Sequence, residues 1–294
     1  DSDQSGLSHR FAKRLERRPR DAFERTDRKE AGMITKRLEF SDRFRSGETL
    51  YGTFLKVPAT MPAEIMGSLG YDFVVVDEEH SPFNRETTDR IILACKAVGL
   101  AAIVRVQSSA AAHILSVLDC GADGVLVPHV SDAPTAQAIV AAGRYRVGKR
   151  GFAPTTRAGD FGRVGQSEHM ETEDRRVTII AMIEDPDAIE NIDEILAVDG
   201  LDGVFIGRGD LAAAYAGLSD APALVRKATE TVHAAAAKAG RTVAILPGSP
   251  EDAAIQFRAG SSAFIIASDQ SFLRSAAMQA HAQMSDAVKQ VTTE

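Results

Sequence analysis

Short apolar runs rich in β-branched residues alternate with longer amphipathic stretches along most of the chain. Most of the short runs are almost continuously apolar, which is typical of strands covered on both faces, as in a parallel sheet. The predicted strands are 50–57, 72–79, 101–106, 124–130, 178–184, 203–208, 242–247 and 261–267. Helical periodicity is clearest between them, at 85–98, 109–121, 132–144, 186–197 and 222–239. Strand-then-helix units repeated over about 240 residues predict a closed (β/α)8 TIM barrel rather than an open sheet.

The chain divides into a leader over 1–32 and a single barrel domain over 33–294. The leader is rich in charged residues, holds few large apolar ones and precedes Met33, a candidate natural start. We expect it to be a disordered leader or an added extension. A basic arm for an anionic partner is the alternative, but Arg17 and Arg18 are interleaved with acidic residues such as Glu16.

The connection from 145 to 177 is polar, glycine-rich and longer than the others. Long irregular loops in compact domains are commonly functional. We therefore expect this connection to cover the mouth of a pocket.

Composition and charge indicate which kind of molecule the protein binds. With 44% hydrophobic and 26% charged residues the chain is ordinarily globular. Its net charge of -7 disfavours nucleic acid. Cys95 and Cys120 lie in apolar helical patterns without CxxC spacing, which favours buried thiols in a reducing compartment. No apolar run approaches the roughly 18 residues that span a bilayer, and no signal peptide is evident. We expect a cytoplasmic protein with small-molecule substrates, and neither a nucleic-acid nor a membrane partner.

Charged side chains stand where four of the predicted strands end. In closed barrels the reacting groups lie at the carboxyl ends of the strands, because the loops there ring one open face. A charge beside an apolar interior is costly unless it is paired, metal-bound or hydrated. The charged strand ends are Asp77, Glu78, Glu79 and His80, then Arg105, then Glu184, and finally Arg208 with Asp210.

Glu184 and Asp210 end neighbouring strands and could converge on one ion. Two carboxylates without a Cys or His cluster suit a hard, oxygen-preferring ion such as Mg²⁺ or Mn²⁺, and they leave coordination positions for a substrate. In the alternative reading, each carboxylate caps the helix that follows it. Strand position alone leaves the two readings balanced.

His80 follows two carboxylates, and a carboxylate beside an imidazole fixes its tautomer and raises its basicity for general-base work. The alternative is a loop histidine without a catalytic role. Arg105 offers a fixed cation for an oxyanion, or it forms a buried ion pair with Asp77 or Glu79. His129, in VPHV, could line the pocket. We find no lysine at a strand end that could form a Schiff base.

Residues 207–212, GRGDLA, match the GxGxxA pattern of dinucleotide-binding sites, with Asp220 as a candidate ribose ligand. The motif lies in the sixth unit rather than the first, and Asp210 would face the negative pyrophosphate. We therefore disfavour a dinucleotide site. The Arg-Gly-Asp tripeptide within it is read as a coincidence.

Several linked stretches carry a family resemblance. They are DFVVVDEEHSPFN at 72–84, IVRV at 103–106, LDCGADGVLVPHV at 118–130, RYRVGKRGFAP at 144–154, MIEDPDAIENIDEIL at 182–196 and GLDGVFIGRGDLA at 200–212. From about Leu38 to Ala280 the chain resembles the HpcH/HpaI family of class II pyruvate aldolases. The resemblance implies a barrel of the phosphoenolpyruvate/pyruvate type. It also implies reversible cleavage of 4-hydroxy-2-oxo acids to pyruvate, or a close 2-oxo acid, and an aldehyde.

The resemblance also implies roles for particular residues. The family's acid/base histidine corresponds to His80, its aspartate partner to Asp77 and its strand-end arginine to Arg105. In this scheme His80, oriented by Asp77, takes a methyl proton from pyruvate, and Arg105 steadies the oxyanion. A further catalytic aspartate, which reaches a neighbouring subunit's site, corresponds to Asp119. The implied assembly is a homo-oligomer, commonly a hexamer with an exchanged C-terminal helix.

The metal ligands implied by the resemblance are Glu184 and Asp210, which would hold Mg²⁺, Mn²⁺ or Co²⁺. Substrate contacts fall on Arg105, Arg208, Gly209 and Asp210. Many relatives have Pro-Ala where this chain has Arg208 and Gly209, and Trp-Gly where it has Phe161 and Gly162. Arg208 adds a cation, so either the aldehyde is anionic or the pocket pairs the cation internally.

Two rival functions remain open at this point. A citrate-lyase-β-like or malyl-CoA-lyase-like enzyme would share the barrel and the carboxylate metal site but act on a CoA thioester. A non-catalytic 2-oxo acid binding protein would keep the pocket without the chemistry. The intact set of charged strand ends argues against the non-catalytic protein.

Overall fold

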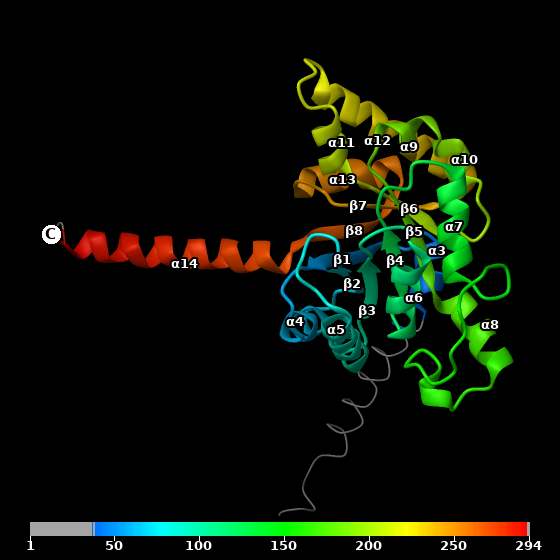
Figure 1. Cartoon of the computed structure of the whole chain (residues 1–294). Coiled ribbons are helices and arrows are strands. Elements are labelled where there is room, and N and C mark those ends of the chain that lie inside the picture. Colours follow the sequence, from blue (N-terminus) through cyan, green and yellow to red (C-terminus); the bar gives the residue numbers. More distant parts are fainter. Residues whose placement is uncertain (1–36, 38, 293–294) are drawn as a thin grey trace, which may run out of the picture.

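Parallel strands pair in sequence order from β1 to β8, and β8 pairs back with β1, so the sheet closes into a barrel (Figure 1). The computed structural model describes residue 37 and residues 39–292. The strands are β1 (Leu50–Leu55), β2 (Phe73–Asp77), β3 (Ala101–Arg105), β4 (Gly124–Val127), β5 (Thr178–Ile183), β6 (Gly203–Ile206), β7 (Thr242–Ile245) and β8 (Ser261–Ser268). The predicted (β/α)8 barrel is confirmed. The predicted leader over 1–32 lies outside the described residues.

Helix α3 (Phe40–Arg45) precedes the first strand, the helices between the strands surround the barrel, and α14 (Asp269–Thr292) follows the last strand and projects away from it (Figure 1). The helices between the strands are α4 (Met61–Ser68), α5 (Arg85–Ala97), α6 (Ala111–Asp119), α7 (Ala133–Gly143), α8 (Gln166–Arg176), α9 (Pro186–Glu190), α10 (Ile192–Leu196), α11 (Arg208–Ala214), α12 (Ala221–Ala239) and α13 (Pro250–Ala259). The side chains of Asn84, Asp132 and Ser249 accept backbone N–H bonds and define where α5, α7 and α13 begin. The helix predicted over 186–197 is broken at Asn191, whose side chain donates to the Ser131 carbonyl oxygen.

Two apolar clusters fill the protein, one inside the barrel and one between the strands and the helices. On β2, Val74 and Val76 face the helices, while Phe73 and Val75 face the interior. This alternation follows from the two-residue period of a strand. Short helix α3 contributes Phe40 to the inner cluster, where its ring lies 5.5 Å from that of Phe73. Helix α3 therefore covers the end of the barrel at which the strands begin.

The connection over 145–177 does not cover the pocket, contrary to our expectation. It contains a short 3-10 turn, η1 (Asp160–Gly162), and helix α8, which packs against α3. None of its residues lines the large cavity described below. An ion pair attaches the connection near the start of β4, since Arg176 at the end of α8 bonds to Asp123 just before β4 begins.

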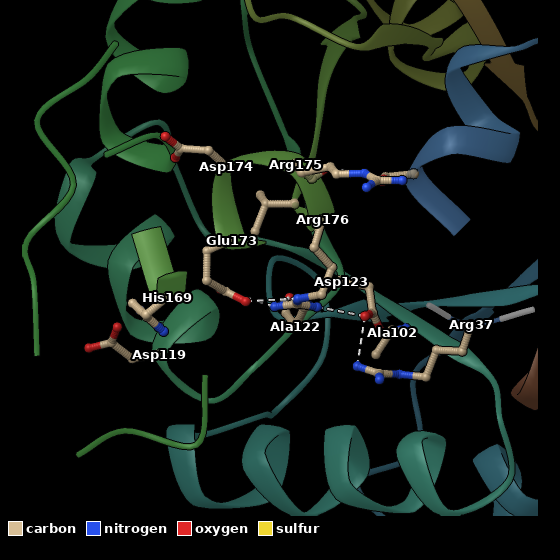
Figure 2. A network of polar contacts seen from close by, with 12 residues as sticks. Arg37, Ala102, Asp119, Ala122, Asp123, His169, Glu173, Asp174, Arg175 and Arg176 are labelled. Carbon is tan, nitrogen blue, oxygen red and sulfur yellow. Dashed lines mark hydrogen bonds and ion pairs between the residues drawn. The ribbon is translucent and has the colours of Figure 1, made fainter. Parts of the chain in front are cut away.

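Arg176 is the centre of a buried charge network (Figure 2). Its guanidinium donates to Asp123 at 2.6 Å and to Glu173 at 2.8 Å. Arg37 adds a second cation, 2.7 Å from Asp123. The other oxygen of Asp123 accepts the backbone N–H of Ala102 on β3 at 2.9 Å. The network thereby ties α8 to the starts of β3 and β4.

Replacing Arg176 with Met should destabilise the protein by on the order of 3 kcal/mol, because two buried carboxylates lose a cation. The neighbouring Arg175 is a matched control, since it forms an exposed pair with Asp42 and its side chain is 77% exposed. Surface pairs contribute about 0 to 1 kcal/mol, so Arg175→Met should change little. Urea unfolding of both variants measures the difference, and equal losses would contradict the assigned role.

Candidate active site

The inward-facing positions of three strands change from apolar to charged at one end of the barrel. On β2 the inward series runs Phe73, Val75, Asp77, and on β3 it ends at Arg105. The next inward position after Met182 on β5 is Glu184. Asp77 and Arg105 are register partners on adjacent strands. The alternation of the strands therefore delivers a carboxylate, a guanidinium and a second carboxylate to the same rim.

Asp77 and Arg105 form a buried bidentate pair. Arg105 Nε donates to one carboxylate oxygen at 2.8 Å and Nη2 donates to the other at 2.7 Å. Burial pushes the pKa of Asp77 upward, but Arg105 and Lys56 outweigh it and the net shift is downward. A further nitrogen, Nη1, lies 3.3 Å from Glu79. The ion-pair reading of Arg105 is thus what the structure shows, while its guanidinium still lines the cavity.

Lys56 is a site residue that our sequence analysis missed. It directly follows β1, and its Nζ lies 3.1 Å from Asp77 Oδ2. Our statement that no lysine stands at a strand end is therefore wrong, because the predicted strand over 50–57 hid the true end at Leu55. The amine is held in an ion pair, and an ammonium has no lone pair with which to attack a carbonyl. The pair with Asp77 argues against a Schiff-base role.

His80 lies beside Glu79 rather than against the carboxylate of Asp77. Its Nε2 is 3.7 Å from Glu79 Oε2, and its side chain is 56% exposed. Asp77 accepts the backbone N–H of His80 at 3.2 Å. Asp77 therefore positions the chain at His80, whereas Glu79 is the carboxylate nearest the ring. The difference from expectation arises because Arg105 and Lys56 already occupy the oxygens of Asp77.

Asp210 lies close enough to Glu184 for its negative charge to affect the ionisation of Glu184. Burial raises the pKa of Glu184 to about 7, and the negative charges of Asp210 and Glu79 add to the effect, although His129 opposes it. Neither carboxylate occupies a helix cap, since Asp185 is the N-cap of α9 and Gly207 is the N-cap of α11. The structure thus shows neither carboxylate as an N-cap, although Asp210 lies in the first turn of α11, where a negative charge is favourable.

The donor set at this rim suits a hard divalent cation. Glu184 is 2% exposed, and its nearest charged neighbours include other carboxylates. A cation between Glu184 and Asp210 would offset that repulsion, and oxygen donors are those that Mg²⁺ and Mn²⁺ prefer. Gly207 also leaves room, because a Cβ there would lie 3.0 Å from Glu184 Oε2 and 2.5 Å from Glu184 Cβ. Within the described part of the chain, no group of three or more His, Cys, Asp or Glu forms a ready metal cluster.

His129 belongs to the same rim. Its backbone N–H donates to Glu184 at 2.8 Å, and its ring Nδ1 lies 3.1 Å from Asp185. Burial lowers the pKa of His129, but Asp185, Glu184 and Glu79 outweigh burial and raise it. The backbone of His129 is left-handed, with φ of 54°, which is strained for a side chain of this size. The strand-end motif VPHV was the signal for this residue.

A cavity of about 860 Å³ opens beside these groups. Lys56, Arg105, Gly209 and Asp210 line it together with Arg208. The structure therefore brings the four predicted substrate contacts to one cavity. Arg208 pairs with Asp252 in α13, a residue that our sequence analysis did not single out.

Asp119 lies apart from this cavity. It ends α6 and approaches Arg150 at 3.9 Å, in the region of Glu173 and His169 (Figure 2). Burial raises the pKa of Asp119, while Arg150 opposes the shift. Within one chain, Asp119 does not join the other predicted site residues.

Added Mn²⁺ or Mg²⁺ should raise the melting temperature of the chelated protein, because a ligand that binds only the folded state stabilises it. Gly207→Ala should reduce this rise, since the new methyl group displaces the Glu184 carboxylate. Gly165→Ala is the matched control, because a Cβ at Gly165 meets nothing within 4 Å. Differential scanning fluorimetry with and without metal tests both variants. No metal-dependent shift in the unaltered protein would reject the ion site.

Comparison with known proteins identifies the family of this chain. Residues 50–275 match the HpcH/HpaI aldolase/citrate lyase family. The hydroxypyruvate/pyruvate aldolase of Rhizorhabdus wittichii is 35% identical over 243 residues, which cover 80% of this chain and 94% of the relative. The 5-keto-4-deoxy-D-glucarate aldolase of an Enterobacter species is 31% identical, covering 81% of this chain and 94% of the relative.

A solved structure gives the same result. A family protein from Burkholderia cenocepacia superposes with a TM-score of 0.78 at 29% identity, covering 84% of this chain and 98% of the other. The family match extends over more than half of the chain and includes all eight barrel strands. The chain therefore belongs to the HpcH/HpaI aldolase/citrate lyase family and is a carbon-carbon lyase.

Proposed function

We propose that the protein is a divalent-metal-dependent class II pyruvate aldolase. It cleaves 4-hydroxy-2-oxo acids reversibly to pyruvate, or a close 2-oxo acid, and an aldehyde. The observation that carries the proposal is the charged rim, where inward positions of β2, β3 and β5 bring Asp77, Arg105 and Glu184 together at one open end of the barrel. The aldolase names of the two relatives described above support the same chemistry.

Glu184 and Asp210 would hold the ion, with Mg²⁺, Mn²⁺ or Co²⁺ as candidates. When bound, such an ion supplies Lewis acidity that lowers the cost of forming an enolate from a 2-oxo acid. Around it, Arg105 is already fixed by Asp77, so its third guanidinium nitrogen, Nη1, which lies 3.3 Å from Glu79, is held in position to stabilise an oxyanion. Asp77 thus acts through Arg105 rather than directly on the substrate.

His80 is the proposed general acid and base. Its ring is accessible and lies next to Glu79, so it is placed to exchange a proton with a bound substrate. In the addition direction, His80 takes a proton from the methyl carbon of pyruvate, and that carbon attacks the aldehyde. Cleavage follows the same steps in reverse. His129 is placed to orient Glu184 through its backbone N–H bond.

Pyruvate release from a panel of 4-hydroxy-2-oxo acids tests the function, and His80→Ala tests the proposed base. The variant should lose roughly 10²- to 10⁴-fold in turnover, which is the usual contribution of a positioned general base. Its melting temperature should stay near that of the unaltered protein, because the side chain is exposed. Coupled lactate dehydrogenase follows the pyruvate.

The same assay distinguishes a pyruvate aldolase from a citrate-lyase-like enzyme that acts on CoA thioesters. His113→Ala is the control, because that ring belongs to α6 and contacts Ser108, whereas the ring of His80 lies beside Glu79. Cleavage of CoA thioesters without pyruvate release would favour the citrate-lyase-like reading instead. Full turnover in His80→Ala, or in protein treated with EDTA, would reject the assigned base or the ion respectively.

We further propose a homo-oligomer, a hexamer, in which the C-terminal helix is exchanged between subunits. Helix α14 projects away from the barrel in Figure 1. Large apolar side chains along it are exposed, with Leu273 at 68%, Met278 at 65% and Met284 at 69%. Exposed apolar surface of this kind is typical of an interaction site. In such an assembly, Asp119 could enter a neighbouring subunit's cavity, which its separation from the site within one chain would explain.

The double variant Met278→Glu/Met284→Glu should lower the molar mass in solution, because charge on the apolar face opposes helix packing. The matched control is Gln279→Glu/Gln283→Glu, which adds the same charge at adjacent exposed positions. Light scattering after size-exclusion chromatography measures the mass. If the unaltered protein already has the mass of a single chain, the assembly proposal fails.

We place the protein in the cytoplasm, without a nucleic-acid partner. Both cysteines, Cys95 and Cys120, are free and buried. This state suits a reducing compartment. No helix in the described residues has the length and apolar character required to cross a membrane.

A further inference from the structure

We propose that the aldehyde partner is uncharged, and that the Arg208–Asp252 ion pair sets this preference by neutralising a cation of the cavity lining that would otherwise attract an anionic aldehyde. The inference rests on the proposed aldolase function and names the substrate class of the same site. It concerns the part of the cavity that extends from Asp210 toward α13.

That part of the cavity has mainly apolar walls. Phe205 and Leu246 contribute from β6 and the end of β7, and Pro247 and Ile266 complete the surface. Ser249, Ser268 and Ser271 are the hydroxyl groups on its lining. An apolar or hydroxylated chain loses little on entering such a space, whereas an anion loses its hydration and needs a cationic partner.

Arg208 is not free to be that partner. Its Nη1 donates to Asp252 Oδ1 at 3.1 Å, and its Nη2 donates to Asp252 Oδ2 at 2.5 Å. Nη2 also donates to the carbonyl oxygen of Leu246 at 2.8 Å. This bidentate geometry holds the guanidinium against α13 and directs three of its five N–H donors to the protein.

Asp252 is held in turn. It accepts the backbone N–H of Gly248 at 2.8 Å and the side-chain amide of Gln256 at 2.9 Å. Arg208 and these donors keep the pKa of Asp252 well below its usual range. The carboxylate therefore stays charged, and the pair presents no net charge to the cavity.

The other two cations on the lining are also paired. Lys56 lies 3.1 Å from Asp77, and Arg105 bonds to both oxygens of that carboxylate. Among the cavity-lining residues that the structure describes, each cation thus has a carboxylate partner. A negatively charged aldehyde would meet only cations whose charge is already offset by a carboxylate, whereas a neutral aldehyde needs no cation.

The test compares butanal with succinic semialdehyde, which has the same chain length and a terminal carboxylate. The unaltered protein with pyruvate and Mn²⁺ should give a higher kcat/KM for butanal. Asp252→Asn frees the Arg208 charge, and a charge-assisted hydrogen bond to the substrate carboxylate then becomes available. The ratio of kcat/KM should shift roughly tenfold or more toward succinic semialdehyde.

Two further variants make the test specific. Glu251→Gln removes the same charge from the adjacent exposed residue, where no bond to Arg208 is formed, and it should keep the original ratio. The double variant Arg208→Gln/Asp252→Asn removes both charges, so it should return the ratio to that of the unaltered protein. This double variant also serves if Asp252→Asn alone folds poorly.

Preference of the unaltered protein for succinic semialdehyde would overturn the inference, as would an equal shift in Glu251→Gln. So would a double variant that selectively loses activity toward succinic semialdehyde. Exchange of the pyruvate methyl protons with deuterium, measured without any aldehyde, separates this inference from the function. Absent exchange rejects the aldolase itself, whereas exchange with the wrong aldehyde preference rejects only the role of the ion pair.

Discussion

The two-residue alternation of the barrel strands decides where charge can stand in this protein. Inside the barrel the inward positions must be apolar, because a charge there would lack both water and partners. At the carboxyl ends that restriction ends, and the next inward residues are Asp77, Arg105 and Glu184. Closure of the sheet brings these residues around one opening, although they come from distant parts of the chain. The site is thus a consequence of strand parity and barrel closure.

The rim pairs each of its lysine and arginine cations with a carboxylate, but it also holds two further carboxylates close together. This difference bears on which ligands the site can bind. The cations Lys56, Arg105 and Arg208 each have a carboxylate partner. Among the described residues, Glu184 and Asp210 form no ion pair with a lysine or arginine, and the charged neighbour of Glu184 that opposes its raised pKa is His129, 3.5 Å away. Burial and the negative charge of Asp210 outweigh that effect. A divalent ion fits where the protein supplies excess negative charge. Because Asp252 pairs with Arg208, the part of the cavity beside α13 carries no net positive charge. We infer that it favours a neutral aldehyde.

The sequence anticipated the barrel and the charged strand ends because both depend on local pattern. Continuous apolar runs separated by amphipathic stretches are sufficient to predict parallel strands and helices. The sequence pattern predicted the ends of the strands less accurately than the existence of the strands. Extending the first predicted strand to residue 57 concealed Lys56, which the hydrogen-bonded ladder places just beyond Leu55. The resemblance to known aldolases added the catalytic and metal-binding roles of particular residues. Local sequence pattern does not contain these roles, because they depend on the substrate and the ion that the site binds.

The sequence by itself determined which residues alternate inward along each strand, and hence which charges reach the rim. Only the tertiary structure decided how those charges are paired. Arg208 and Asp252 lie 44 positions apart, and Asp77 is shared between residues on β3 and just after β1. Likewise, the connection over 145–177 packs beside α3, and Arg176 ties it to Asp123 just before β4, so it does not lie over the cavity. Such partners are chosen by distance in the folded chain, which sequence separation does not report.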